Sequence, residues 1–167
     1  MCYNTNNCLD AQTKYPQRLS RKEDLFLMKI DCQISRTLSQ DAAMIREAVF
    51  IKEQGFQNEF DSTDNVSFHL VLYANAAPAA VARLFSEEND GTYTIGRIAV
   101  LPEFRGLHLG SRVLSEAEKC AVENGAKRLI LSAQCRVKPF YEKNGYKAVG
   151  NVYLDENCPH IRMEKLL

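Results

Sequence analysis

Residues 97–110 read Arg97-Ile-Ala-Val-Leu-Pro-Glu-Phe-Arg-Gly-Leu-His-Leu-Gly110, and they are the most informative part of the sequence. A short apolar strand is followed by a proline turn, a basic loop that contains glycine, and the start of a helix. The first N–H groups of a helix have no partner within the helix, and the helix dipole places partial positive charge there. Glycine lets the main chain approach an anion closely, and Arg105 adds donors suited to phosphate oxygens. The stretch therefore predicts an anion site, although a plain strand–turn–helix connection with a solvated arginine fits the spacing equally well.

The loop lacks two common nucleotide-binding motifs. Ser111-Arg112 follows Gly110, so the lysine and the hydroxyl residue that end a Walker loop are absent. Gly106 and Gly110 are four residues apart, which does not fit the dinucleotide pattern G-x-G-x-x-G. A nucleotide-phosphate binder with another kind of loop stays open at this point.

Two blocks of the chain are similar to motifs of one family. The segment Arg105-Gly-Leu-His-Leu-Gly110 resembles the pyrophosphate loop of the GNAT acyltransferase superfamily, Gln/Arg-x-x-Gly-x-Gly/Ala, with His108 where the middle glycine is usual. Tyr141-Glu-Lys-Asn-Gly-Tyr146 matches a later element of the family, and Gln134 stands where asparagine is more common. The resemblance covers residues 29–167. Three further segments are similar to the ElaA-like branch: 46–55, 60–69 and 155–161.

This resemblance implies a fold and a reaction. The fold is a single α/β domain with a mixed, mostly antiparallel central sheet, flanked by helices and splayed at the acetyl-CoA site. The reaction is transfer of an acetyl group from acetyl-CoA, the cosubstrate, to a primary amine of a small molecule or a peptide, by direct attack through a tetrahedral intermediate. No metal is expected. The resemblance implies these cofactor-binding residues: Ile98, Ala99, Val100, Arg105, Gly106, Leu107, His108, Leu109, Gly110, Ser111, Gln134, Lys138, Phe140 and Tyr141.

Tyr141 is the expected general acid. A phenol with a pKa of about 10 stays protonated at neutral pH and can donate to a departing thiolate, although a tyrosine can also simply pack its helix onto the sheet. The general base is open among Glu53, His69 and His160, each in a segment that resembles the ElaA-like branch. Histidine needs the smallest pKa change to act near neutral pH. Each imidazole can equally be a core or surface group bonded to backbone, and a water chain can replace a single base.

Three residues are candidates for binding the acceptor: Arg46, Gln54 and Arg97. Arg46 and Glu53 are seven residues apart and share a helix face, which fits either an acceptor pocket or a solvated charge stripe. Arg97 is charged within an otherwise apolar strand, so it either binds a carboxylate of the acceptor or ends on the wet face of the sheet. Asp61 and Asp64 fit either attraction of a cationic amine or a capped acidic turn.

Hydrophobic periodicity predicts the element order β-α-β-β-β-α-β-α-β-β. The expected strands are 29–36, 66–74, 79–86, 92–100, 129–131, 146–149 and 161–166. The expected helices are 40–54, 108–124 and 138–144, with a short helix or loop at 56–65. Ser39 is the expected N-cap of the first helix, Asn89-Asp90-Gly91 the expected hairpin turn, and 129–131 a strand expected to be buried on both faces.

Composition narrows the class of protein. The chain has 167 residues and a formal net charge of zero, which suits one domain with a core and argues against a nucleic-acid partner. The six cysteines form no Cys-x-x-Cys pair, so we expect reduced thiols in the cytoplasm, and Cys135 is expected to be a buried hydrophobe. No apolar run is long enough to predict a membrane span. The expected basic patch for the phosphates of CoA comprises Arg105, Arg112, Arg136 and Lys138.

Two regions are expected along the chain. Residues 1–28 are predicted to be a polar, loosely ordered N-terminal extension, and residues 29–167 the acetyltransferase-like domain. A homodimer is expected only because acetyltransferases of this kind often form one. The competing function is a catalytically weak module that binds or senses acyl-CoA, which His108 and the unassigned base keep open.

Overall fold

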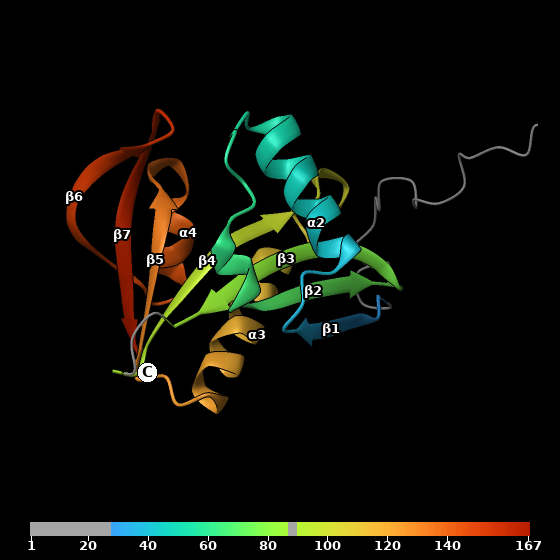
Figure 1. Ribbon diagram of the computed structural model, residues 1–167, viewed down its shortest axis with the longest axis horizontal. Coiled ribbons are helices and arrows are strands. Elements are labelled where there is room, and N and C mark those ends of the chain that lie inside the picture. The colour runs from blue at the N-terminus through green and yellow to red at the C-terminus, as the bar shows by residue number, and fades with distance from the viewer. Residues whose placement is uncertain (1–27, 87–89) are drawn as a thin grey trace, which may run out of the picture.

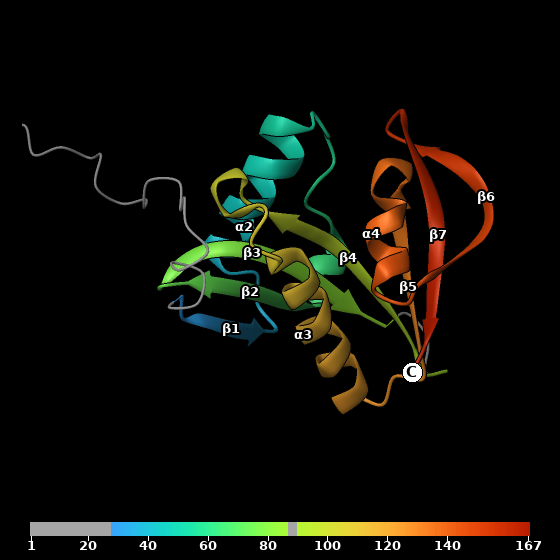
Figure 2. The ribbon, with the colours of Figure 1, turned by 180° about the vertical axis from the view of Figure 1, so that it is seen from behind.

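The computed structural model describes residues 28–86 and 90–167. The expected N-terminal extension, apart from Met28, therefore lies outside the described residues, and so does Asn89 of the expected hairpin turn. Within the described part, seven strands form one mixed sheet, and helices lie on both of its faces. Figure 1 shows α2 in front of the sheet, and Figure 2 shows α3 and α4 on the opposite face.

The order of the helices and strands matches the prediction, and their bounds are as follows. The strands are β1 (Ile30–Ser35), β2 (Phe68–Ala74), β3 (Ala77–Phe85), β4 (Thr92–Val100), β5 (Arg128–Gln134), β6 (Lys147–Asp155) and β7 (Cys158–Leu166). The α-helices are α2 (Gln40–Arg46), α3 (Leu109–Glu123) and α4 (Lys138–Lys143). The remaining helical turns are the π-helix η1 (Glu47–Glu53) and the 3₁₀ turns η2 (Ser62–Asn65), η3 (Pro102–Phe104) and η4 (Cys135–Val137).

The sheet opens between β4 and β5. The strand order is β1-β2-β3-β4-β5-β7-β6, and every neighbouring pair is antiparallel except β4 and β5. These two parallel strands pair only along 92–94 and 128–130, and beyond that point they diverge, as Figure 1 shows. The predicted mixed, mostly antiparallel sheet is confirmed. The divergence leaves the β5-facing edge of β4 without a strand partner from Ile95 onward.

One continuous core lies between the sheet and its helices. The apolar stripe predicted for α3 is buried, with Val113, Leu114 and Ala117 at most 1% exposed. They pack over β2, β3 and β4, so the helix that follows the 105–110 loop is anchored to the sheet. Truncation of a leucine such as Leu114 to alanine at a site of this kind costs about 2–5 kcal/mol.

The first helix differs from the prediction in its second half. Ser39 caps it as expected, because its hydroxyl accepts a hydrogen bond from the N–H of Ala42 at 3.1 Å. After Arg46, however, the backbone winds as a π-helix, whose wider turn shifts every later side chain around the axis. The expectation that Arg46 and Glu53 share one face is therefore wrong.

A β-bulge interrupts β4 at Arg97. The register with β3 shifts between Val81 and Arg83, and Arg97 has a φ of +52°. This left-handed conformation costs a residue with a Cβ about 1–2 kcal/mol. The sequence predicts a regular strand here, since apolar periodicity carries no signal for one inserted residue. Such strain is commonest beside functional sites.

The C-terminal strands are longer than predicted. Burial alternates along β5, with Leu129 and Leu131 buried and Ile130 between them only partly buried, so the prediction that 129–131 is buried on both faces is wrong. β6 and β7 form a hairpin whose two turn residues, Glu156 and Asn157, both have positive φ. This is the backbone of a type I′ turn, which matches the twist of the two strands.

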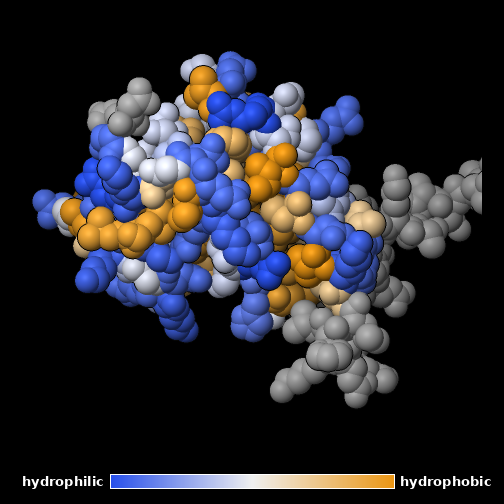
Figure 3. Space-filling model, turned by 90° about the horizontal axis from the view of Figure 1, so that it is seen from below, coloured by the Kyte–Doolittle hydropathy of each residue, from blue (hydrophilic) through white to orange (hydrophobic). Residues whose placement is uncertain are grey.

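β6 is the free edge of the sheet at the C-terminal end. Its exposed large hydrophobic residues are Val149, Val152, Tyr153 and Leu154, and Figure 3 shows apolar surface at this end of the molecule, on the left. No helix among the described residues has the length and the apolar character needed to span a bilayer.

Candidate active site

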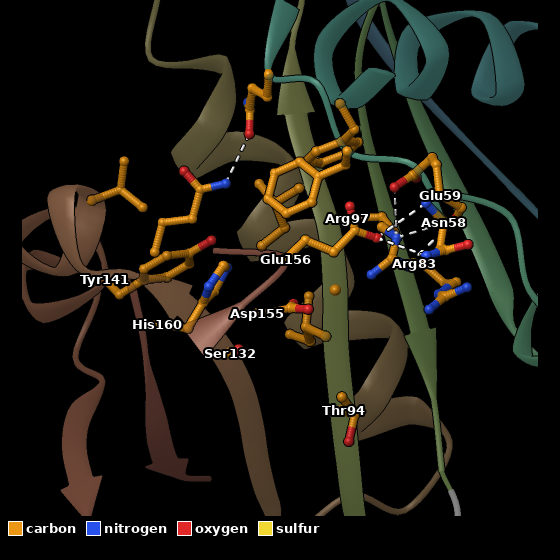
Figure 4. Close-up of a pocket in the computed structure, with 18 of the residues that line it drawn as sticks. Asn58, Glu59, Arg83, Thr94, Arg97, Ser132, Tyr141, Asp155, Glu156 and His160 are labelled. Carbon is orange, nitrogen blue, oxygen red and sulfur yellow. Dashed lines mark hydrogen bonds and ion pairs between the residues drawn. The ribbon is translucent and has the colours of Figure 1, made fainter. Parts of the chain in front are cut away.

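A cavity of about 290 Å³ lies where β4 and β5 part. Its walls come from β4, β5, the end of η1, the loop that follows η1, and the β6–β7 hairpin (Figure 4). Arg83, Arg97 and Glu59 lie on one side of the view, and Tyr141 and His160 lie on the other. The lining residues are Phe50, Gln54, Phe56, Asn58, Glu59, Arg83, Phe85, Thr94, Ile95, Gly96, Arg97, Ile98, Ser132, Gln134, Arg136, Val137, Tyr141, Asp155, Glu156 and His160.

His160 is held in one tautomer. Its Nδ1 lies 2.8 Å from the carbonyl oxygen of Cys158, and a carbonyl can only accept, so Nδ1 carries the proton of the neutral ring. The ring is stacked on Tyr153, with centroids 6.2 Å apart, and meets Phe56 edge-on at 6.4 Å. Nε2 therefore keeps its lone pair on a ring that lines the cavity. This is the arrangement of a fixed proton acceptor.

Tyr141 lies on α4 and lines the same cavity. Burial raises the pKa of its phenol to about 12, so the hydroxyl stays protonated through the physiological range. Phe140 meets its ring edge-on at a centroid distance of 4.9 Å, and Tyr146 does so at 6.1 Å. Tyr146 is also buried, but it does not line the cavity.

Arg46 is a buried structural cation. It is fully buried, and its Nε and Nη1 each contact a carboxylate oxygen at 2.6 Å, from Glu59 and Asp64 respectively. Its remaining donors reach the carbonyl of Glu59 and the second oxygen of Asp64. The expectation that Arg46 binds the acceptor does not fit this burial. Its guanidinium instead fixes the 59–64 loop against the first helix.

The same loop is a capped acidic turn. Asp61 is the N-cap of η2, and with Asp64 it forms a capping box. Burial alone would raise the pKa of Asp64, but hydrogen bonds from Arg46 and Arg83 outweigh it and lower that pKa to about 2. These carboxylates are therefore already paired with arginines. This favours the capped acidic turn over attraction of a cationic amine.

His69 lies outside the cavity. It is 2% exposed, and its Nε2 is 2.9 Å from the carbonyl oxygen of Asp64. Its position on β2 places it beside the arginine–carboxylate cluster, where no acceptor amine can reach it. Of the three candidate bases, the structure brings only His160 to the wall of the cavity.

The loop before α3 has the backbone of an anion cradle. Gly106 has a φ of +83°, and His108, at the glycine position of the motif, has a φ of +58°. His108 gives α3 no side-chain cap, so the first N–H groups of this 15-residue helix remain available to a ligand. At Gly110, a Cβ would lie 3.5 Å from Phe140 and 3.8 Å from Val100. The geometry fits a diphosphate at the helix start.

Arg105 is engaged within the protein. Its Nη1 and Nη2 donate to the two carboxylate oxygens of Glu53 at 3.0 and 2.6 Å, and its Nε donates to the carbonyl of Val100 at 3.0 Å. The hydrogen bonds from Arg105 lower the pKa of Glu53. A carboxylate stabilised in this way is a weaker proton acceptor, which argues against Glu53 as the base.

A chain of side-chain hydrogen bonds joins the C-cap of η1 to the end of β5. Nε2 of Gln134 donates to Oε1 of Gln54 at 2.8 Å, and Nε of Arg136 donates to Oε1 of Gln134 at 2.7 Å. Gln54 ends η1, whereas Gln134 ends β5, so the bridge joins two elements far apart in sequence. Both glutamines line the cavity, and their roles as an acceptor contact (Gln54) and a cofactor contact (Gln134) stay predictions.

The other expected cofactor residues surround the loop and the β4 edge. Ile98 lines the cavity, Ala99 and Leu109 are buried, and Val100 and Leu107 pack against the core. Ser111 accepts a hydrogen bond from Asn144 at 3.4 Å, and Lys138 pairs with Glu142 at 3.4 Å. Cys135, expected to be a buried hydrophobe, packs against the core but is only partly buried.

The sequence did not predict several residues of the cavity wall that contains Arg97. Arg83, Asn58 and Glu156 line the cavity, and both oxygens of Glu156 accept hydrogen bonds from the main chain of Gln57 and Asn58 at 2.7 and 3.1 Å. Arg83 had the same signal as Arg97, a charge inside an apolar strand. Glu156 had none, because the contact joins residues 98 or more positions apart. No group of three or more histidine, cysteine or acidic residues that suits a metal occurs among the described residues.

Comparison with known proteins decides the family. A family model described as an acetyltransferase (GNAT) domain matches residues 34–167. The chain belongs to the GNAT acetyltransferases. Among GNAT relatives, the uncharacterized N-acetyltransferase YjcF of Bacillus subtilis is 36% identical over 129 residues, which are 75% of this chain and 91% of YjcF. Protein ElaA of Escherichia coli is 30% identical over 126 residues, 72% of this chain and 82% of ElaA, which confirms the predicted likeness to ElaA.

Solved GNAT structures agree with this fold. The crystal structure of Escherichia coli ElaA has a TM-score of 0.74 at 27% identity and covers 82% of this chain and 99% of that one. An acyl-CoA N-acyltransferase from Pseudomonas aeruginosa has a TM-score of 0.71 at 26% identity and covers 83% and 99% of the two chains. The protein is therefore an acyltransferase of the GNAT fold, with an acyl-CoA cosubstrate and an amine-bearing substrate.

Proposed function

We propose that this GNAT protein transfers an acetyl group from acetyl-CoA to a primary amine in the cavity between β4 and β5. The observation that carries the proposal is the pairing of a fixed proton acceptor, Nε2 of His160, with a protonated phenol, Tyr141, on the walls of one cavity. The reaction needs a group of each kind, one to deliver a neutral amine and one to protonate the departing sulfur.

His160 is the proposed general base. An alkylammonium has a pKa of about 10 and must lose a proton before its nitrogen can attack. Nε2 accepts that proton, while the hydrogen bond from Nδ1 to the carbonyl of Cys158 keeps the ring oriented. The imidazolium then passes the proton to water. Glu53 and His69 are poorer candidates, because one is held by Arg105 and the other is buried outside the cavity.

Tyr141 is the proposed general acid. The amine nitrogen forms a bond to the acyl carbon and releases its second proton to water, the carbon–sulfur bond breaks, and the phenol proton goes to sulfur. A thiol has a pKa of about 8.5, below that of the buried phenol, so this transfer is uphill and is completed when the phenolate regains a proton from water. The products are the acetylated amine and free thiol.

Acetyl-CoA, the proposed acyl donor, supplies the acetyl group as a thioester. The start of α3, with Gly106 and His108, would hold its diphosphate, and the unpaired β4 edge at Ile98 and Val100 would pair with its amide groups. A backbone N–H that polarises the acyl oxygen contributes about 3 kcal/mol to catalysis in comparable sites. Arg105 would change partners from Glu53 to phosphate.

A second candidate is a module that binds acyl-CoA without turnover. His108 in the glycine position and the engagement of Arg105 by Glu53 are the observations that favour it. The two functions share the cosubstrate site and differ only in chemistry.

Thiol release from acetyl-CoA separates the two functions. The protein is incubated with acetyl-CoA and a panel of amines comprising polyamines, amino acids, amino sugars and peptides. We expect thiol release that depends on one class of amine and falls by about 100-fold in Tyr141→Phe. Saturable binding of acetyl-CoA without amine-dependent thiol release would support the binding module. The homodimer and the cytoplasmic location stay predictions, and light scattering of the purified protein tests the first.

A further inference from the structure

The cavity contains an arginine with unused hydrogen-bond donors. We propose that the acceptor amine also carries a carboxylate, and that Arg97 binds this carboxylate on the wall opposite His160. The inference rests on the proposed acetyl transfer and adds the chemical class of the acceptor. It stands on a comparison of Arg97 with Arg46 and Arg83, which pair with the same carboxylates of the 59–64 loop; a further arginine, Arg136, lines the cavity from η4.

Of Arg46, Arg83 and Arg97, Arg97 has the most exposed side chain and the longest ion-pair contacts. Arg46 is fully buried with ion-pair contacts of 2.6 Å, and the side chain of Arg83 is 5% exposed with contacts of 2.8 and 2.9 Å to Asp61 and Asp64. The side chain of Arg97 is 28% exposed, and its ion-pair contacts are longer, 3.0 Å to Glu59 and 3.4 Å to Asp61.

The free donors of Arg97 lie on one nitrogen. Nε and Nη2 make all of its hydrogen bonds within the described chain, to the carbonyl of Glu59 and to Asp61. Nη1 is therefore left with two N–H groups on a side chain that lines the cavity (Figure 4). A guanidinium donates best to a planar oxyanion, and an acceptor carboxylate is such a group.

A second observation concerns Arg83, which lies on the same wall. Its residue is 4% exposed, and its Nε is buried without a hydrogen-bond partner. A buried guanidinium N–H without a partner is unfavourable, and an added negative charge nearby offsets part of that cost. The carboxylates of Glu59, Asp61 and Asp64 balance the charge of the arginines on this wall, so it is the donors left unpaired within the described chain, Nε of Arg83 and Nη1 of Arg97, that favour an anionic group.

Among the described residues, two of the three carboxylates that line the cavity are already engaged. Glu59 is held by Arg46 and Arg97, and Glu156 accepts hydrogen bonds from Gln57 and Asn58. A polyamine would have to compete for these two, and of the three only Asp155, exposed at the end of β6, is left for it. An amino carboxylate instead presents its amine to His160 and its oxyanion to Arg97.

The backbone at Arg97 supports a functional role for this side chain. Its φ of +52° is the strained centre of the bulge in β4, and strain of this kind clusters at active sites and ligand-binding positions. A regular strand would place the guanidinium differently, because the bulge moves every later residue of β4 by one position relative to β3.

The test compares matched acceptors. Thiol release is measured with glycine and ethanolamine, β-alanine and 3-aminopropanol, 6-aminohexanoate and 6-aminohexanol, and lysine and cadaverine. The members of each pair differ in the carboxylate and have similar length. We expect kcat/KM to be at least about tenfold higher for the carboxylate in the pair whose length spans the cavity.

Variants of Arg97 test whether this residue causes the preference for carboxylates. Arg97→Gln should lower kcat/KM for the preferred carboxylate by about tenfold or more and leave the matched alcohol within about threefold, while the dissociation constant of CoA stays unchanged. Arg97→Lys keeps the charge beside Glu59, so it should fold even if the glutamine variant does not, and it should lose most of the preference because it lacks the planar fork. Arg162→Gln is the control, since Arg162 is exposed and pairs with Glu164 outside the cavity.

Three outcomes would overturn the inference. Equal use of carboxylates and alcohols, higher activity with cadaverine than with lysine, or a preference that survives in both Arg97 variants would each remove it. Acetylation of neutral amines with no carboxylate preference would leave the proposed acetyl transfer intact. Absence of turnover with every amine would remove both.

Discussion

Arg105 and Glu53 form a two-hydrogen-bond ion pair, at 3.0 and 2.6 Å, between the proposed diphosphate loop and the end of η1. Both side chains are well exposed, at 44% and 39%, so the pair contributes little to stability. Its importance is local. A carboxylate beside an anion site opposes the anion, and it holds the arginine that the anion needs.

Glu53→Gln should therefore tighten binding of CoA. We expect the dissociation constant to fall by about threefold to tenfold, because the change removes a negative charge and releases Arg105. Calorimetric titration measures this, and Glu47→Gln, an exposed glutamate of the same helix that pairs with Lys52, is the matched control. We expect kcat to change little. A loss of about 100-fold in kcat with unchanged CoA binding would instead identify Glu53 as the base.

Tyr141→Phe should remove turnover while the fold and CoA binding persist. The hydroxyl makes no protein hydrogen bond within the described residues, so its loss leaves no partner exposed. The matched control is Tyr146→Phe, a buried tyrosine whose ring lies 6.1 Å away but outside the cavity. Since burial raises the pKa of Tyr141 to about 12, the wild-type rate should show no loss up to about pH 10. Equal activity of the two phenylalanine variants would contradict the assignment.

His108→Gly should stabilise the protein or leave its stability unchanged. Glycine relieves the left-handed strain at φ +58°, which is worth about 1 kcal/mol, and the greater freedom of the unfolded chain offsets part of this. His108→Val, whose branched Cβ tolerates this conformation poorly, should lower the melting temperature by about 2–4 °C per kcal/mol of destabilisation. Thermal unfolding measures both variants. A glycine variant clearly less stable than wild type would show that the His108 side chain makes a contact worth more than the strain.

Asp64 should make stability fall in acid. The pKa of Asp64 in the folded protein is about 2, below its ordinary value of 3.8, so its ionised form favours folding. This contribution is complete above about pH 4 and disappears as pH falls through about 2, for a total of about 2 kcal/mol. Urea unfolding across this range measures the slope. Asp64→Asn should be less stable at neutral pH and show a flatter slope, whereas the exposed Asp31→Asn should behave as wild type.

Local patterns predicted most of the fold. The cap at Ser39, the buried stripe of α3 and the strand 92–100 are signals that neighbouring residues carry, and all three are confirmed. Neither the bulge at Arg97 nor the π-helix after Arg46 was predictable. The bulge depends on one residue of register against β3, the π-helix depends on a wider turn within the helix, and apolar periodicity carries no signal for either. Tertiary context decides such cases.

The candidate site was predictable in its parts and not in its pairings. Tyr141, His160 and Arg97 stood out as residue types, and the structure brings them to one cavity. Arg46 also stood out, yet its burial depends on Glu59 and Asp64, which only the folded chain brings to it. A sequence pattern identifies charged residues, but long-range packing decides which of them remain free.

Transfer of a labelled acetyl group tests the central claim most directly. The protein is incubated with coenzyme A that carries a ¹³C-labelled acetyl group and with the amine that the panel selects, and both products are quantified by mass spectrometry and thiol release. We predict labelled acetyl amide in a one-to-one ratio with free thiol, and loss of both in Tyr141→Phe. Free thiol with labelled acetate and no labelled amide, or bound acetyl-CoA with neither product, would contradict the account.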